Sequence, residues 1–84
     1  MNEALINDYL TRLEAARGNE AAFPAIYEEL DGALNADEAK RLCKLFSHAT
    51  ARTKANALHH IWWGHYNIID ARKRAAHNAG RIAG

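Results

Sequence analysis

Apolar residues recur at helical spacing most clearly between Leu58 and Ala79. On a helix of about 100° per residue, they fall on one side, which we call the apolar stripe. It comprises Leu58, Ile61, Trp62, His65, Ile68, Ile69, Ala76 and Ala79, with Arg72 in the same arc. A stripe of this width predicts a helix packed against a core.

The opposite side of the same helix is not plainly polar. We call it the mixed stripe: His59, Trp63, Tyr66, Asp70, Lys73, Arg74 and His77. Trp63 cannot share the apolar stripe unless the helix breaks. Another helix of the chain could cover it, or the mixed stripe could be a dimer seam or partner-binding face. Alternatively, Gly64, which costs about 1 kcal/mol inside a helix, could divide the stretch into two helices.

The first half of the chain predicts two shorter helices. The first spans 2–17, with Asn2 as its cap and Gly18 placed to stop it. Its inward residues are Leu5, Ile6, Tyr9, Leu10, Leu13 and Ala16. After a connector at 18–22, Pro24 suits the first turn of a second helix. That helix turns Ile26, Tyr27, Leu30 and Leu34 inward.

A third helix is predicted from Asn35, whose side chain can cap it while Glu38 reaches back to the cap. Its inward side holds Ala39, Leu42, Cys43, Leu45, Phe46 and Ala49. Through 50–53, either this helix continues or Thr50 or Thr53 caps the next. The last helix should run from Lys54 to about Asn78, roughly 37 Å. Ala79 and Gly80 would end it, before a frayed tail.

These elements predict an all-α fold, a small bundle of four helices with a long C-terminal helix, or five helices if Gly64 breaks the last. The 84 residues form one domain, 1–84, with a modest core. The lone Cys43 is expected to be a buried, inert thiol. Because the N-terminus lacks a signal-peptide pattern and no long apolar run is present, we expect a soluble, cytoplasmic protein with no membrane contact.

The near-neutral net charge hides an asymmetry. Residues 1–40 carry nine acids and three bases, a charge of −6, whereas residues 41–84 carry eight bases and one acid, a charge of +7. The two halves should attract each other when folded together. The basic half could equally contact nucleic acid or an acidic partner.

Motifs for metal binding or catalysis are absent from the sequence. The five histidines (His48, His59, His60, His65, His77) include no pair three or four residues apart, and no HExxH or CxxC motif is present. Cys43 and His48 do not share a helix face, and Ser47 has no evident partner. We therefore predict a non-enzymatic protein without cofactor or metal. His65 reads as a hydrogen-bonded core histidine, with a pH-sensitive interface residue as the alternative.

Two binding functions remain. Nucleic acid could be held by Arg72, Lys73, Arg74 and Arg81, with aromatic residues nearby to stack on bases. However, three consecutive bases spread around a helix, and bases near a helix C-terminus are also favoured by its dipole. We favour a protein–protein interaction module, because the mixed stripe joins aromatic area to charges of both signs.

Its partner would be another protein, a second copy in a homodimer, or both. Small size and the lack of a catalytic motif suit a regulator, adaptor or inhibitor. Phage-encoded or mobile-element inhibitors of host machinery, such as a defence system, share this profile.

Overall fold

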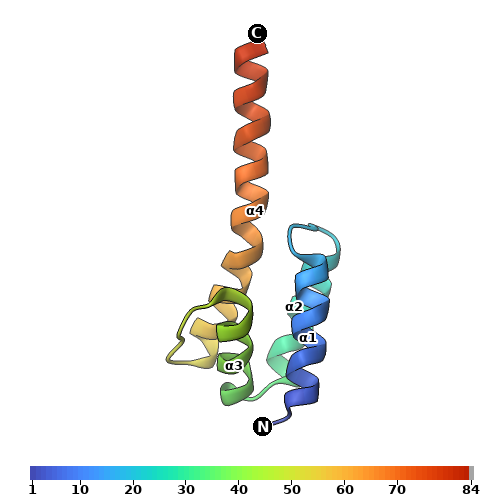
Figure 1. Ribbon diagram of the computed structural model, residues 1–84, viewed down its shortest axis with the longest axis vertical. Helices are drawn as coiled ribbons and strands as arrows, with labels where there is room; N and C mark the ends of the chain where they lie inside the picture. Colours follow the sequence, from blue (N-terminus) through green and yellow to red (C-terminus); the bar gives the residue numbers. More distant parts are fainter. Residues whose placement is uncertain (84) are drawn as a thin grey trace.

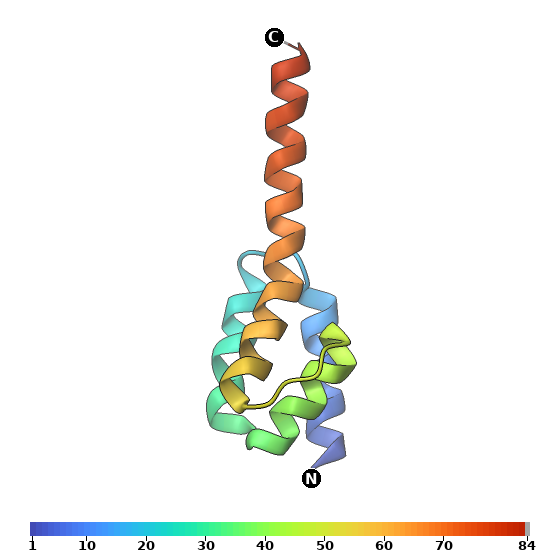
Figure 2. The same cartoon turned by 90° about the vertical axis from the view of Figure 1, so that its left-hand side faces the viewer.

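The computed structural model describes the backbone of residues 1–83 and the side chains of residues 1–77. Within 1–83 the chain forms four helices: α1 (Glu3–Ala16), α2 (Ala22–Ala33), α3 (Ala36–Ser47) and α4 (Lys54–Ala83). The predicted all-α fold with a long last helix is therefore confirmed. Figures 1 and 2 show α1, α2 and α3 gathered around the first part of α4, which then extends alone to the C-terminus.

The helix ends follow from local side-chain chemistry. The Asn2 side chain accepts from the Leu5 backbone N–H at the start of α1. At α3, Asn35 and Glu38 form the predicted capping box. Of the two alternatives at 50–53, the second is correct, because α3 ends at Ser47 and the Thr53 hydroxyl accepts from the Asn56 N–H at the start of α4. Side-chain acceptors thus mark three of the helix starts, as the sequence predicts.

The core lies where the inward faces of the four helices meet. Its largest fully buried side chains come from every helix: Phe23, Phe46, Ile6, Leu13, Leu30, Leu42, Ile61, His65 and Cys43. Cys43 is the buried thiol expected from the sequence, and burial raises its pKa. Phe23, which the periodicity of the second helix does not single out, stacks on His65 and packs against Phe46.

Glu38 ties two helix starts together. Its carboxylate accepts the backbone N–H of Asn35 in its own capping box and that of Asn2 at the start of α1, each at 3.0 Å. These two donors hold the pKa of Glu38 below its usual value. The acid at the third position of α3 therefore anchors the N-terminus of the chain as well as its own helix.

The connector between α1 and α2 is fastened to the middle of α4. Gly18 adopts φ +82°, the left-handed conformation that glycine tolerates best. Its N–H donates to Nδ1 of His65 at 2.9 Å, and its carbonyl accepts from Arg72 at 2.8 Å. Opposite charges of the two halves meet nearby, where Lys73 pairs with Glu20. They meet again at the first residue of α4, where Lys54 pairs with Asp31. Two surface ion pairs thus link the acidic and basic halves.

Two expectations about α4 need correction. The helix does not end near Asn78 but continues to Ala83, because alanines around Gly80 favour helix and one interior glycine costs only about 1 kcal/mol. The covered part of the apolar stripe also stops early: Ile69 is buried, whereas Ala76 is exposed, because the shorter helices do not reach that far. The side chain of Ala79 lies outside the described residues.

The helix is continuous through Gly64, so the alternative of a fifth helix is not realised in residues 1–83. Gly64 serves close packing instead. A Cβ at this position would lie 2.9 Å from the ring of the buried Phe46. Within the described part of the chain, no helix combines the length and apolar character needed to cross a bilayer.

Candidate interaction surface

The mixed stripe lies on the side of α4 that faces away from the core. Ile61, His65 and Ile69 point inward and are buried. Most residues of the mixed stripe are exposed, and Asp70 is half-buried. Trp63 and Tyr66 are each 42% exposed, and Met1 is the other large hydrophobic side chain exposed to this degree in the described residues. α1, α2 and α3 therefore leave much of the Trp63 indole open to solvent.

The aromatic residues of the mixed stripe contact one another. Trp63 packs edge-on against Tyr66, with ring centroids 5.3 Å apart, and edge-on against His59 at 5.8 Å. The Trp63 indole N–H donates to Nε2 of His59, one turn earlier. These contacts hold the two large rings in place on the surface, so little side-chain entropy would be lost when a partner covers them.

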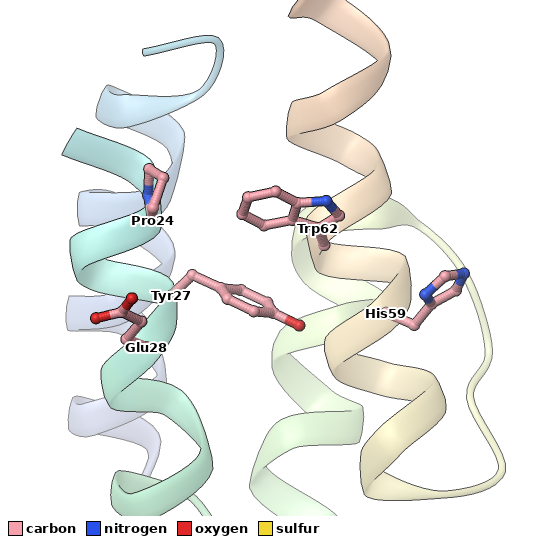
Figure 3. Close-up of a pocket in the computed structure, with 5 residues that line it drawn as sticks. All are labelled: Pro24, Tyr27, Glu28, His59 and Trp62. Carbon is pink, nitrogen blue, oxygen red and sulfur yellow. The ribbon is translucent and has the colours of Figure 1, made fainter. Parts of the chain in front are cut away.

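A groove separates α2 from α4 beside the mixed stripe. It is lined by Pro24, Tyr27 and Glu28 of α2 and by His59 and Trp62 of α4, and Figure 3 shows Tyr27 and Trp62 projecting into the gap between the two helices. Its volume is about 420 Å³. The Tyr27 hydroxyl donates to the Leu58 carbonyl at 3.0 Å, and its ring packs against Trp62 at 5.2 Å. The floor of this groove is thus a fixed aromatic surface.

Two further hollows flank Trp63, and the first of them shares His59 and Trp62 with the groove. One, of about 280 Å³, is lined by His59, Trp62, Trp63 and Tyr66. The other, also about 280 Å³, lies between the end of α3 and α4 and includes Trp63 and Gly64 in its lining. Trp63 therefore stands between two concave areas. The first hollow is lined by aromatic and histidine rings and the second also by polar residues, a mixture that is typical of protein-binding surfaces.

Of the bases considered for nucleic-acid binding, the three with described side chains have partners within the chain. Arg72 donates to the Gly18 carbonyl, Lys73 pairs with Glu20 at 3.6 Å, and Arg74 pairs with Asp70. The Lys73 and Arg74 side chains remain about three-quarters exposed, at 72% and 73%. Arg72 thus acts in the fold, while Lys73 and Arg74 stay accessible on the mixed stripe. The side chain of Arg81 lies outside the described residues.

The remaining titratable groups do not converge. Among the described residues, no group of three His, Cys, Asp or Glu side chains is placed to hold a metal ion. His65 is 1% exposed and stacks on Phe23 with centroids 4.0 Å apart. Its burial lowers its pKa, while Glu20 acts in the opposite sense. The prediction of a hydrogen-bonded core histidine is confirmed.

The sequence reasoning missed the contribution of α2 to this surface. Pro24 and Glu28 line the groove, although Pro24 stood out only as a helix-start residue. Their place beside α4 depends on the packing of two separate helices, which periodicity along one helix does not report.

Arg17 was also missed. Its guanidinium donates to the Phe46 carbonyl at 2.8 Å and lies over the Phe46 ring. The pairing of Arg17 with the end of α3 has no local sequence signal.

Comparison with protein-family models, with curated proteins and with solved structures found no match to this chain.

Proposed function

We propose that this chain is a small, non-enzymatic protein–protein interaction module whose binding surface is the mixed stripe of α4. The observation that carries the proposal is the pair Trp63 and Tyr66, held edge to edge on the face of α4 that its own bundle leaves open. Tryptophan, tyrosine and arginine are the residues that most often dominate interface energies. Trp63 and Tyr66 would be the anchors, and Arg74 and Lys73 the charged flank.

Such a module would act as a regulator, adaptor or inhibitor by occupying a surface of its partner. The end of α4 extends beyond the other helices, next to the aromatic pair Trp63 and Tyr66. A partner bound along α4 could therefore contact aromatic and charged side chains of the same helix. This arrangement suits inhibitors of host machinery carried by phages and mobile elements, including inhibitors of defence systems. We offer this class as one candidate setting for the module.

Nucleic-acid binding is the less favoured alternative. Lys73 and Arg74 are exposed and close to aromatic rings, but each pairs with a carboxylate of the same chain. Neutralised bases release fewer counterions from a phosphate backbone and so contribute less to affinity. A binding isotherm with single-stranded and duplex oligonucleotides at two salt concentrations would reveal this activity through a steep loss of affinity with salt.

Site-specific photo-crosslinking in the native host tests the proposed interface directly. A photoreactive phenylalanine analogue at Tyr66 should give discrete protein adducts on illumination. The same analogue at Thr11, an exposed position on α1, is the matched control and should give none. Adducts at Tyr66 of any mass support the function, whereas adducts at neither position, or only at Thr11, contradict it.

A further inference from the structure

Six residues of the mixed stripe follow a seven-residue repeat. His59, Trp63, Tyr66, Asp70, Lys73 and His77 are separated by steps of four, three, four, three and four. All six are exposed or half-buried, and they face away from the core side of α4. This alternation is the spacing at which one helix packs along another in a coiled coil. α4 therefore carries a seam for a second helix.

The charges along this seam disfavour a parallel pair of identical helices. In parallel register, Asp70 would oppose Asp70, and Lys73 would oppose Lys73. In an antiparallel pair that places Trp63 opposite Tyr66, the acid Asp70 instead opposes His59. Lys73 then opposes Asn56, which is exposed on the first turn of α4. The sequence of α4 is thus complementary to itself in the antiparallel direction.

The hydrogen bonding of His59 fits this pairing. Because Nε2 of His59 accepts the Trp63 indole N–H, Nδ1 is the ring nitrogen left to donate. That Nδ1–H is a donor on the exposed seam. The Asp70 carboxylate already accepts from Arg74 and has lone pairs left for a second donor. An antiparallel second copy would bring this donor and this acceptor together twice.

We propose that the occupant of the mixed stripe is a second copy of this chain, bound through an antiparallel α4–α4 seam with Trp63 against Tyr66 of the partner subunit. This inference rests on the proposed function, since it takes the mixed stripe to be a protein interface. Trp63 and Tyr66 of both copies then meet at the two-fold axis. The rings of one copy lie against the hollow that His59, Trp62, Trp63 and Tyr66 line on the other copy. Aromatic anchors at the centre with charged pairs at the ends are the usual anatomy of a stable interface.

Sedimentation equilibrium of the full chain tests the occupant. The wild-type chain should form a concentration-dependent dimer. Trp63→Ala should raise the dimer dissociation constant at least about a hundredfold, because two central tryptophans are lost per dimer. Asp70→Asn should raise it about tenfold, because an amide oxygen accepts the two His59 N–H groups less strongly than a carboxylate does. Both variants should keep the helical circular dichroism of the wild type, and Arg41→Ala, an exposed base on α3, is the matched control that should leave the dimer unchanged.

A single spin label tests the direction and register. Ala75 is exposed and lies off the seam, so Ala75→Cys can carry a nitroxide, while the native Cys43 is buried. In the proposed register the two labels should be about 33 Å apart, from 1.5 Å of rise per residue and 8–10 Å between helix axes. A parallel pair would give about 10 Å, and an antiparallel pair shifted by one repeat about 23 Å or about 43 Å, depending on the direction of the shift.

The outcomes separate the two proposals. A monomer at all concentrations up to about 0.5 mM would exclude any dimer of useful affinity and overturn the second copy as occupant. A dimer unaffected by Trp63→Ala, or with a label distance of about 10, 23 or 43 Å, would overturn the arrangement. In each of these cases, adducts of other proteins at Tyr66 would still support the proposed function. If no such adducts formed either, both the proposed function and the second copy as occupant would be contradicted.

Discussion

Trp62 and Trp63 are neighbours in sequence with opposite surroundings. Trp62 packs against Phe23, Tyr27 and His65 in the body, whereas Trp63 contacts His59 and Tyr66 on its own helix. The step of about 100° between consecutive helical residues accounts for the difference. The two side chains therefore form a natural pair for separating folding from binding.

We expect the two alanine substitutions to differ sharply in stability. Trp62→Ala should lower the unfolding free energy by about 2–3 kcal/mol, since it opens a cavity among packed rings. Trp63→Ala should cost less than about 1 kcal/mol, because a surface side chain with contacts on its own helix contributes little. Thermal melts followed by circular dichroism, at concentrations low enough to keep the chain monomeric, measure both. Equal losses would place Trp63 in the core and contradict the proposed surface.

His65 should make the stability depend on pH. Its ring accepts the Gly18 N–H through Nδ1, and its burial lowers its pKa. The unfolded chain then binds a proton more readily than the folded chain below about pH 6.5. The contribution of His65 is therefore fully present above pH 6.5 and is lost as pH falls toward the lowered pKa. Charged groups around this contact include Arg17 next to Gly18, Arg72 on the Gly18 carbonyl, and Glu20, which pairs with Lys73.

Urea titrations of the wild type and His65→Gln between pH 5 and 8 isolate this effect. Glutamine can still accept the Gly18 N–H but does not titrate. The difference in unfolding free energy between the two proteins should shrink or reverse as pH falls below about 6.5. A difference that stays constant across this range would show that His65 does not titrate during unfolding.

At the scale of helices, Gly32 in α2 and Gly64 in α4 differ in what surrounds them. Nothing lies within 4 Å of a Cβ built on Gly32 in α2, whereas one on Gly64 in α4 would meet the Phe46 ring at 2.9 Å. Phe46 is 1% exposed and has the Arg17 guanidinium over its face, so it has no room to move aside. The glycine at 64 therefore sets the spacing of α3 and α4.

Gly32→Ala should stabilise the protein by about 0.5–1 kcal/mol through helix propensity alone. Gly64→Ala should destabilise it by about 1 kcal/mol or more, because the overlap with Phe46 outweighs the same propensity gain. Chemical denaturation of both variants gives the comparison. An increase in stability from Gly64→Ala would mean that α3 and α4 can separate at little cost.

The sequence predicted the helices well because their signals are local. Capping residues such as Asn2 and Asn35, and the apolar stripe up to Ile69, each depend on residues a few positions apart. The mixed stripe was found by the same periodicity. The groove was not, because Pro24 and Glu28 join Trp62 only when α2 packs beside α4. Contacts such as Gly18 with His65 also link residues 47 positions apart and leave no local pattern.

The end of α4 shows a further limit of pattern reading. Alanine and glycine at 79–80 predict a helix end, since glycine is common there. The helix nonetheless runs on to Ala83, and the residues from Ala71 to His77 are exposed without a covering helix. An uncovered stripe on a free-standing helix is visible only once the lengths of all four helices are compared in space.

At the scale of the whole molecule, the chain is an elongated body of 53 × 23 × 17 Å whose long axis follows α4 (Figure 1). The last contacts between α4 and the body involve Arg72 with Gly18 and Lys73 with Glu20. Among the described side chains, those from Arg74 to His77 contribute no burial to the core. The stability of the body and the length of α4 should therefore be separable.

Deleting residues 75–84 tests this separation. The shortened chain should keep its melting temperature to within about 3 °C, since an exposed helix end contributes under about 0.5 kcal/mol. It should also still dimerise in the proposed register, because the seam from Asn56 to Lys73 remains intact. A chain shortened further, after Ile69, is the contrasting variant: it loses both Arg72 and Asp70, so it should melt lower and fail to dimerise. The first deletion could instead abolish the dimer while leaving the melting temperature unchanged. That result would make the free end of α4 part of the interface. The proposed register would then be replaced by one shifted toward the C-terminus, with His77 against His59 of the partner subunit.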